Sequence, residues 1–250
     1  MNSFLLPRIP SRRAYGRMFA KPRLWAPAVR EVLGRHGLRA GRLGATFPGT
    51  CAVFAVGPDL IVKFFPPWVA RDWSAEGAVL DALRGRLPVP RIVAHGSLRD
   101  RVEWRYLILR PVGGRPVREV WPRMSVPERH AVAAAAGRFL NALHRVPPPR
   151  SLRGRRGVLL HADLNEDHVI VRRRHGRWRF AGVIDFADAR TGDPLGEWMP
   201  VWLGLLRHDP GLLRSFLRGY APRLQITRRW RARAAAAVMA HMYGLRTVRD

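Results

Sequence analysis

The chain has 250 residues, of which 47% are hydrophobic, so it can bury a core as one large domain or as two lobes and is not a disordered chain. Its formal net charge is +27, from 45 Lys and Arg against 18 Asp and Glu. A single cysteine, Cys51, excludes an internal disulfide framework and a cysteine-rich zinc site.

The positive charge has two interpretations. A strongly basic chain is typical of proteins that bind nucleic acid or another polyanion. However, the only lysines are Lys21 and Lys63, and the arginines are scattered along a chain that is also rich in Ala, Gly and Pro. This bias favours a GC-rich coding sequence over a selected binding face, so a nucleic-acid partner is the less favoured interpretation. The charge is still expected to attract anionic ligands.

Membrane insertion and secretion are not expected. No stretch approaches 18 uninterrupted apolar residues, and the N-terminal residues lack the continuous apolar region of a signal peptide. The sequence therefore predicts a cytoplasmic protein with no membrane partner, and it does not indicate an oligomeric state.

The first part of the chain predicts mainly strands. Residues 1–40 are expected to form an N-terminal arm, loosely packed up to about residue 25, followed by a helix over 25–37 with Pro27 near its start. Turn dipeptides, apolar runs and one helical periodicity then predict strands over 42–47, 50–56 and 59–65, a helix over 67–86, and a hairpin of 91–99 and 101–110.

The second part predicts mainly helices. The Gly- and Pro-containing segment 111–116 is the expected boundary between a first lobe, 41–111, and a second lobe, 112–250. After it we expect helices over 126–146, 193–208, 211–220 and 228–245, with a hairpin of 169–174 and 177–185. The order predicts an α+β fold with two lobes.

Lys63 is a candidate functional cation. It lies in the apolar strand LIVKFF of a chain whose cations are otherwise almost all Arg. A compact ammonium group reaches a single phosphate oxygen where a guanidinium fork is too wide. Glu76, in the following helix, is positioned to pair with Lys63 and orient its amine.

Acidic residues gather in one part of this basic chain. Asp163 lies in the segment HADLNEDHVIV before a strand, and Asp185 ends the next strand in VIDFAD. Two carboxylates brought close together repel each other unless a cation or a proton lies between them. The hairpin spacing therefore predicts a shared site, whereas pairing with Arg172 to Arg174 is the structural alternative.

These segments resemble the aminoglycoside and choline kinase-like phosphotransferases. HADLNEDHVIV is similar to their H-x-D-x-x-x-x-N catalytic loop, and VIDFADARTGDPLGEW is similar to their metal-binding segment. LIVKFF with Glu76, YLILRPVGGRP and FLNALHRVP resemble the nucleotide lysine, the hinge and the helix before the catalytic loop. The resemblance implies a protein kinase-like fold, with an antiparallel sheet and one helix in the first lobe and a mainly helical second lobe.

The resemblance also implies the roles of individual residues. Asp163 would accept the proton of a substrate hydroxyl, and Asp185 would bind Mg²⁺ with the phosphates of ATP. Lys63 would contact the phosphates, held by Glu76. The remaining nucleotide contacts would come from the turn at Pro48, Gly49 and Thr50, from Gly44, and from the backbone of Leu109 to Val112, which includes Arg110.

His168 departs from the family pattern, because it stands where the family has a metal-binding Asn. Imidazole suits Mg²⁺ poorly. His168 is expected either to ligate a metal, with a shift towards Mn²⁺, or to hydrogen-bond Asp163 while Asp185, Asp167 or Asp188 takes the metal. A third alternative is an impaired site.

The supporting residues have mixed interpretations. His161 is expected to brace the loop through the backbone or Asp185, and Asp193 before Pro194 is expected to cap a helix. Asp188 and Glu197 are left as supporting or substrate-facing residues. The predicted function is an ATP-dependent phosphotransferase acting on a small-molecule hydroxyl. A pseudokinase or regulatory nucleotide-binding module of the same fold and a basic nucleic-acid-binding protein are the alternatives.

Overall fold

The computed structural model describes residues 4–9, 11–46, 49–152, 157–223 and 227–242. The chain divides into two compact units. The first comprises Met1–Gly77 and Pro90–Pro111, and the second comprises Ala78–Val89 and Val112–Asp250. Each unit is described by itself.

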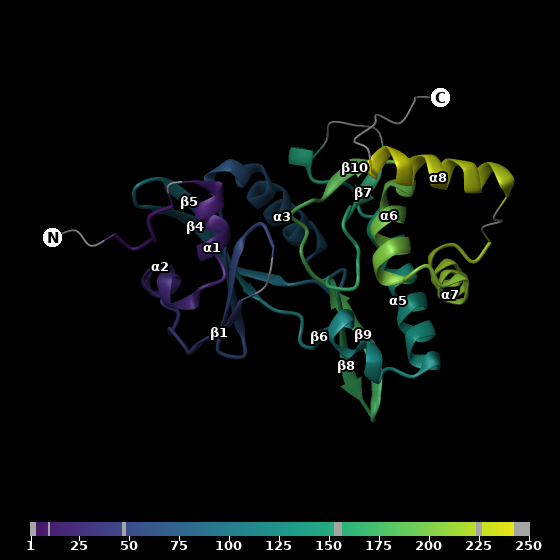
Figure 1. Cartoon of the computed structure of the whole chain (residues 1–250), viewed down its shortest axis with the longest axis horizontal. Helices are drawn as coiled ribbons and strands as arrows, with labels where there is room; N and C mark the ends of the chain where they lie inside the picture. The colour runs from purple at the N-terminus through teal and green to yellow at the C-terminus, as the bar shows by residue number, and fades with distance from the viewer. Residues whose placement is uncertain (1–3, 10, 47–48, 153–156, 224–226, 243–250) are drawn as a thin grey trace. The chain divides into compact units, whose positions relative to one another are not determined.

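The first unit is built on a five-stranded antiparallel sheet (Figure 1). The strands run in the order β1-β2-β3-β5-β4, so β3 lies at the centre. A 3-10 turn, η1 (Pro67–Val69), leads into helix α3 (Ala70–Leu83), and the predicted antiparallel sheet with one inserted helix is confirmed. The strands are β1 (Leu43–Thr46), β2 (Ala52–Val56), β3 (Leu60–Phe65), β4 (Arg91–Arg99) and β5 (Glu103–Arg110).

The N-terminal residues are part of the core of the first unit, so the prediction of a loosely packed arm is wrong for the residues that the structure describes. Helix α1 (Arg12–Met18) is capped by Ser11, and α2 (Pro22–Arg35) begins earlier than expected. Tyr15 and Trp25 are buried against Phe54 and other apolar residues of the sheet. Aromatic burial offsets the unfavourable Pro27 inside α2.

The second unit contains helices and short sheets. β8 pairs with β9 as the predicted hairpin and also with β6, while β7 pairs with β10. The elements are β6 (Arg115–Pro116), α4 (Val117–Val120), η2 (Trp121–Arg123), α5 (Val126–His144), η3 (Arg150–Leu152), β7 (Val158–Leu160), β8 (Val169–Arg174), β9 (Arg177–Val183), β10 (Arg190–Gly192), η4 (Pro194–Glu197), α6 (Trp198–Pro200), η5 (Val201–Leu205), α7 (Pro210–Tyr220) and α8 (Arg228–Met242).

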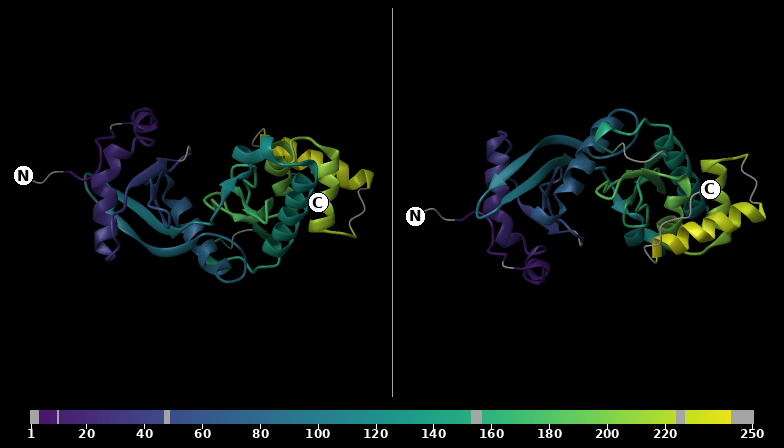
Figure 2. Two further views of the ribbon diagram at one scale, coloured as in Figure 1. Left: turned by 90° about the horizontal axis from the view of Figure 1, so that it is seen from below. Right: turned by 90° about the horizontal axis from the view of Figure 1, so that it is seen from above.

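Helices α5 and α7 pack closely against each other, and Figure 2 draws them from below and from above. Two glycines allow this approach. A Cβ at Gly137 of α5 would meet the backbone of Phe216, and a Cβ at Gly219 of α7 would meet the backbone of Ala134. The backbones therefore fill the space that a side chain would need, and substitution at either glycine would force the helices apart.

The predicted helix over 193–208 is broken in the structure. It consists of the 3-10 turn η4, the single turn α6 and the π-helical turn η5. Pro200 has no N–H to donate to the carbonyl four residues earlier, which interrupts a regular α-helix at its middle. Helix α8 follows the expected range up to Met242, and residues 243–245 of that prediction lie outside the described residues. Among the helices that the structure describes, none is long and apolar enough to cross a membrane.

Candidate active site

Lys63 and Glu76 form a buried ion pair in the first unit. Lys63 lies on β3, directly opposite Val53 and Leu107 on the two neighbouring strands, and Glu76 lies on α3. Their side chains are 6% and 2% exposed, and Nζ is 2.7 Å from Oε2. Because both charges are removed from water, replacement of either one would leave an uncompensated buried charge on the other.

The turn before β2 is held by the N-terminal segment. The Tyr15 hydroxyl on α1 donates to the backbone carbonyl of Thr50 at 2.9 Å, and burial raises the pKa of Tyr15 well above its usual range. Gly49 has a φ of +156°, which favours glycine. Gly44 lies within β1, and Pro48 lies outside the described residues.

The expected hinge residues lie at the end of β5. Arg110 is exposed and pairs with Arg91 of β4 in the sheet. The first unit ends at Pro111, and the chain belongs to the second unit from Val112 onward.

In the second unit, His161 opens the loop between β7 and β8 and is fully buried. Its Nε2 lies 3.0 Å from the Ile184 carbonyl, and its Nδ1 lies 3.2 Å from the backbone N–H of Asp163. A carbonyl only accepts, so Nε2 carries the proton and Nδ1 accepts from Asp163. Burial lowers the pKa of His161, which favours this neutral form. His161 thus joins the loop to the end of β9 through backbone groups.

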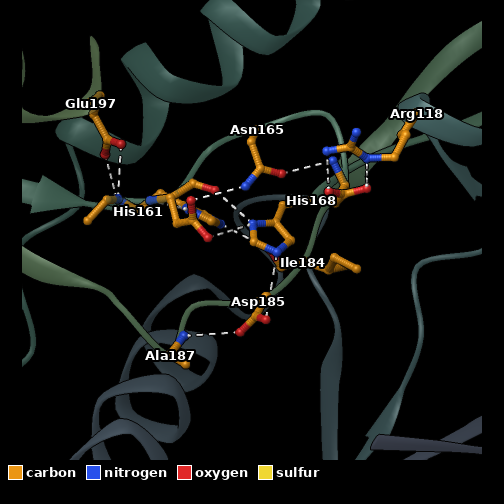
Figure 3. A network of polar contacts seen from close by, with 11 residues as sticks. Arg118, His161, Asn165, His168, Ile184, Asp185, Ala187 and Glu197 are labelled. Atoms are coloured by element: carbon orange, nitrogen blue, oxygen red, sulfur yellow. Dashed lines mark hydrogen bonds and ion pairs between the residues drawn. The ribbon is translucent and has the colours of Figure 1, made fainter. Parts of the chain in front are cut away.

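Glu197 holds the same loop from the other side (Figure 3). Its two carboxylate oxygens accept the backbone N–H groups of His161 and Ala162, at 2.5 and 2.9 Å. The residue is 1% exposed and lies 3.7 Å from Nε2 of His144. A buried carboxylate that receives two backbone donors is an anchor for the loop.

Asp163 follows the anchored residues in the loop and keeps contact with solvent. Its side chain is 41% exposed, and its Oδ1 accepts from Nδ2 of Asn165 at 3.0 Å. Desolvation raises the pKa of Asp163, against a lowering influence from His168 and the Asn165 hydrogen bond. A partly desolvated carboxylate with one oriented oxygen is chemically suited to accept a proton.

His168 lies between the two aspartates of the proposed site. Its Nδ1 donates to the Asp163 backbone carbonyl at 2.7 Å and lies 3.5 Å from Oδ2 of Asp163. Its Nε2 lies 3.8 Å from Oδ2 of Asp185, and Figure 3 shows the ring edge directed to that carboxylate. The hairpin therefore brings both aspartates within reach of one imidazole ring.

Two residues of this site have a left-handed backbone without being glycine. Ala162 has a φ of +71° and Asp185 a φ of +64°. Such conformations cost free energy and persist only where the surrounding contacts hold them. The Glu197 hydrogen bond holds Ala162, and a hydrogen bond of 3.4 Å from the Ala187 N–H reaches Oδ1 of Asp185.

The remaining acids of the loop are paired with arginine. Arg118 of α4 binds both oxygens of Asp167, at 2.5 and 2.8 Å, and lies 3.1 Å from Glu166. The fork geometry of this Arg–carboxylate pair occupies Asp167. Hence the site contains acids of two kinds: those of the loop that Arg118 neutralises, and Asp163 of the loop with Asp185 after β9, which lie beside His168.

The other supporting residues differ in position. Asp188 is exposed, and its charge contributes to the raised pKa of Asp163. Asp193 caps η4 by accepting from the Leu195 N–H at 2.8 Å, and its other oxygen pairs with Arg233. Asp193 is therefore used for structure in this part of the chain.

A metal ion would find few protein ligands here. In the ranges that the structure describes, no three His, Cys, Asp or Glu residues are grouped to hold one. Asp185 and Nε2 of His168 are a pair of donors, one oxygen and one nitrogen. Mg²⁺ in nucleotide sites commonly takes one or two carboxylates and completes its shell with phosphate oxygens and water, so Asp185 fits such an ion.

Sequence reasoning missed two contributors, Tyr15 and Arg118, and left a third, Glu197, without a defined role. Tyr15 was hidden in a segment without clear periodicity, and Glu197 could not be assigned, since its partners are backbone groups 35 and 36 residues away. Arg118 is one arginine among many, and nothing in its local sequence marks it as the partner of Asp167.

One family model matches most of the chain. The model of the phosphotransferase enzyme family matches residues 49–157 and 149–235. Among curated proteins, the lysine-specific demethylase JMJ21 of Arabidopsis thaliana is 30% identical over 69 residues. That match spans 24% of this chain and only 7% of the demethylase, which is too short to bear on activity.

Solved structures share the fold. The GDP complex of wild-type aminoglycoside 2'-phosphotransferase-IIIa has a TM-score of 0.66 at 15% identity, covering 85% of this chain and 87% of that one. The streptomycin–ATP complex of APH(2")-IIa has a TM-score of 0.62 at 17% identity, covering 86% of each chain. WaaP in complex with acyl carrier protein has a TM-score of 0.55 at 17% identity, covering 90% and 95%. The expected α+β kinase-like fold is confirmed.

Proposed function

Because the chain belongs to the phosphotransferase enzyme family, we propose that it transfers the terminal phosphate of ATP to a hydroxyl group of a small molecule. The observation that carries the proposal is the loop geometry. Asp163 is half-exposed and oriented by Asn165, and the same imidazole ring contacts both Asp163 and Asp185.

Asp163 is the general base of the proposed reaction. The acceptor hydroxyl loses its proton to the Asp163 carboxylate while its oxygen bonds to the γ-phosphorus, and the bond from that phosphorus to the β–γ bridging oxygen breaks. ADP leaves with the electron pair of that bond. The transition state needs positioning and charge neutralisation more than covalent help, so the backbone anchor at Glu197 and the His161 brace serve the rate by holding the loop.

Lys63 binds the phosphates of the nucleotide in this proposal, and Glu76 keeps its ammonium group oriented. Gly49 and Thr50 approach the phosphates through the turn that Tyr15 holds, and Gly44 approaches them from β1. The backbone at Arg110 and Val112 meets the nucleobase. These assignments follow from the family resemblance and from the buried Lys63–Glu76 pair.

In this proposal Asp185 would hold a divalent metal ion, and Nε2 of His168 would be the second protein donor. When bound, a divalent ion neutralises charge on the nucleotide phosphates. Because imidazole nitrogen suits Mn²⁺ better than Mg²⁺, we propose that this site accepts Mn²⁺ at least as well as Mg²⁺. Asp167 is excluded from the ligand set because both of its oxygens bind Arg118.

The acceptor is proposed to be a neutral or anionic hydroxyl compound. Related structures contain the polycations kanamycin and gentamicin. In the part of the second unit that the structure describes, however, Glu166, Asp167 and Asp193 are already paired with arginines. Few carboxylates are therefore left to receive the amino groups of an aminoglycoside, and the net charge of +27 repels a polycation.

A pseudokinase is the second candidate function, and His168 favours it, since a nitrogen donor in place of an amide oxygen weakens binding of Mg²⁺. The two candidates are separated by transfer of label from γ-labelled ATP, and from GTP because relatives bind GDP, onto a panel of hydroxyl compounds with Mg²⁺ or Mn²⁺. Transfer to any member supports the enzyme. Nucleotide binding that Lys63→Met weakens, without transfer to any acceptor or to water, supports the pseudokinase.

A further inference from the structure

The end of the β8–β9 hairpin presents a surface made of arginine. In the antiparallel register, Arg172 lies opposite Arg179 and Arg174 lies opposite Arg177. Directly opposed residues point to the same face of a sheet, and residues two apart on a strand do so as well. Arg172, Arg174, Arg177 and Arg179 therefore share one face of the hairpin, and all four are exposed.

The other face of the hairpin is used for packing. There, Arg173 lies over the Trp178 ring at 5.9 Å and donates to the Gly176 carbonyl. Phe180 contacts Phe139 of α5, with ring centroids 5.9 Å apart. The four arginines, together with His175 and Phe180, line a hollow of about 510 Å³, and Arg179 and Phe180 also border helix α5.

This arrangement costs stability in the isolated protein. Like charges directly opposite each other on a sheet repel. In the described parts of the chain, no carboxylate forms an ion pair with any of the four arginines, whereas Arg118 and Arg233 each have an acidic partner. Four unneutralised guanidinium groups around one hollow are expected where an anion binds.

We propose that the arginine face of the β8–β9 hairpin is a binding site for a compact, multiply phosphorylated anion, separate from the loop that carries Asp163. Guanidinium groups form paired hydrogen bonds with phosphate oxygens. Positions two apart on a strand are about 6.6–6.8 Å apart and opposed positions about 5 Å, so long side chains from all four positions converge on an anion of two to four phosphates. The hollow has the volume of a small-molecule site.

A nucleic acid is the competing ligand. It would need a basic track that continues along its backbone, since its affinity comes from many successive phosphates. The arginine face spans two ladder positions on each strand and is bounded, which favours a short oligophosphate. Short phosphate chains are found both in inorganic polyphosphate and in nucleoside polyphosphates. The test therefore compares one probe of each kind, tripolyphosphate and ATP.

The test is calorimetric titration with inorganic tripolyphosphate, in EDTA so that metal-dependent binding is absent. The background protein is Lys63→Met/Glu76→Gln, which weakens the nucleotide site without leaving an uncompensated buried charge. The test variant is R172Q/R179Q, which removes one opposed pair and keeps the length of the side chains. The control R86Q/R145Q removes the same charge from two other exposed arginines of the second unit. ATP and a single-stranded oligonucleotide without a terminal phosphate are titrated in parallel.

The proposal expects binding of tripolyphosphate that weakens with salt and falls at least about tenfold in R172Q/R179Q, since each lost charge-assisted bond is worth that order. The control should bind as the parent does. If ATP binds as tightly as tripolyphosphate, the phosphate chain is the part that is recognised. If ATP binds more weakly than tripolyphosphate, inorganic polyphosphate is the favoured ligand. Phosphotransfer cannot be measured in the Lys63→Met/Glu76→Gln background, because the nucleotide site is weakened there. R172Q/R179Q is therefore also made in the wild type, where basal transfer should be unchanged.

Thermal unfolding gives an independent readout. Without ligand, R172Q/R179Q should unfold at the same or a higher temperature than its parent, since a repulsive pair is removed, and tripolyphosphate should no longer raise that temperature. Three results would overturn the proposal. They are an equal loss of affinity in R86Q/R145Q, an unchanged affinity in R172Q/R179Q, and an oligonucleotide that binds more tightly per phosphate than tripolyphosphate does.

Discussion

Nε2 of His168 lies 3.8 Å from Oδ2 of Asp185, while Nδ1 of the same ring donates to the backbone carbonyl of Asp163. The ring is thus fixed from one side and presents its second nitrogen to the carboxylate on the other. A single residue couples the position of the proposed base to the proposed metal ligand, so its chemistry is expected to set the metal preference.

We predict that His168→Asn shifts the preference from Mn²⁺ towards Mg²⁺. An amide oxygen is a harder donor than an imidazole nitrogen, and the Asn amide retains a donor for the Asp163 carbonyl. The ratio of kcat/KM with Mg²⁺ to kcat/KM with Mn²⁺ should rise severalfold. His175→Asn is the control, because His175 is exposed at the hairpin turn and has a φ of +48°, which Asn tolerates. An unchanged ratio in His168→Asn would remove His168 from the ligand set.

We predict that Glu197→Gln lowers both stability and turnover. The amide keeps one acceptor oxygen, so one of the two backbone N–H groups at His161 and Ala162 loses its partner, at a cost of about 1–3 kcal/mol. Urea unfolding measures that cost. Because Ala162 has a positive φ, the loosened loop should also move Asp163 and lower kcat.

The matched control for Glu197 is Glu128→Gln. Glu128 likewise accepts two backbone N–H groups, those of Ser125 and Trp178, and these contacts lower its pKa. Its substitution should cost stability without lowering kcat in the native state. A fall in kcat of the same size in both variants would mean that the effect of Glu197 is not specific to the loop.

We predict that Asp163→Asn stabilises the fold at neutral pH. Desolvation raises the pKa of Asp163 in the folded state. The protonated carboxyl group therefore contributes to the stability of the fold. This contribution is fully present below the ordinary Asp pKa of about 3.9 and is lost as pH rises through the pKa of the folded state. The variant avoids this loss. Thermal unfolding from pH 3 to pH 8 should therefore show a gap in favour of Asp163→Asn that opens with rising pH. A gap that opens with falling pH would contradict the raised pKa.

We predict that Tyr15→Phe weakens nucleotide binding. The hydroxyl of Tyr15 holds the Thr50 carbonyl in the turn proposed to approach the phosphates, and its loss should cost about 1 kcal/mol, equivalent to roughly fivefold in affinity. Tyr106→Phe is the control, since the Tyr106 hydroxyl contacts His36 in the same unit at 2.9 Å. If both variants bind nucleotide as the wild type does, Thr50 does not serve the nucleotide.

The strands of the first unit, the β8–β9 hairpin and helix α5 were predictable, because their apolar periodicity and turn residues act locally. The Lys63–Glu76 pair was also expected, since strand and helix in one unit leave a buried cation few other partners. The N-terminal helices were not predictable, because their burial depends on contacts of Trp25 with strand residues 29 and 79 positions away, Phe54 and Trp104. The broken helix at Pro200 and the Glu197 anchor likewise depend on tertiary contacts that no local pattern encodes.

The site was predictable in part. The spacing predicted Asp163 before the first strand of a hairpin and Asp185 at the end of its second strand, and the structure brings both beside His168. Which acids remain available could not be read from the sequence, since it depends on which of 45 cations reaches each carboxylate. Arg118 settles that for Asp167 by a bidentate contact 49 residues away in the chain.

Transfer of label from γ-labelled ATP to an identified hydroxyl acceptor, compared between the wild type and Asp163→Asn, tests the central claim most directly. The account predicts transfer by the wild type with Mg²⁺ or Mn²⁺, and no measurable transfer by Asp163→Asn although that variant is folded and binds ATP with unchanged affinity. Full turnover of the same acceptor by Asp163→Asn would contradict it.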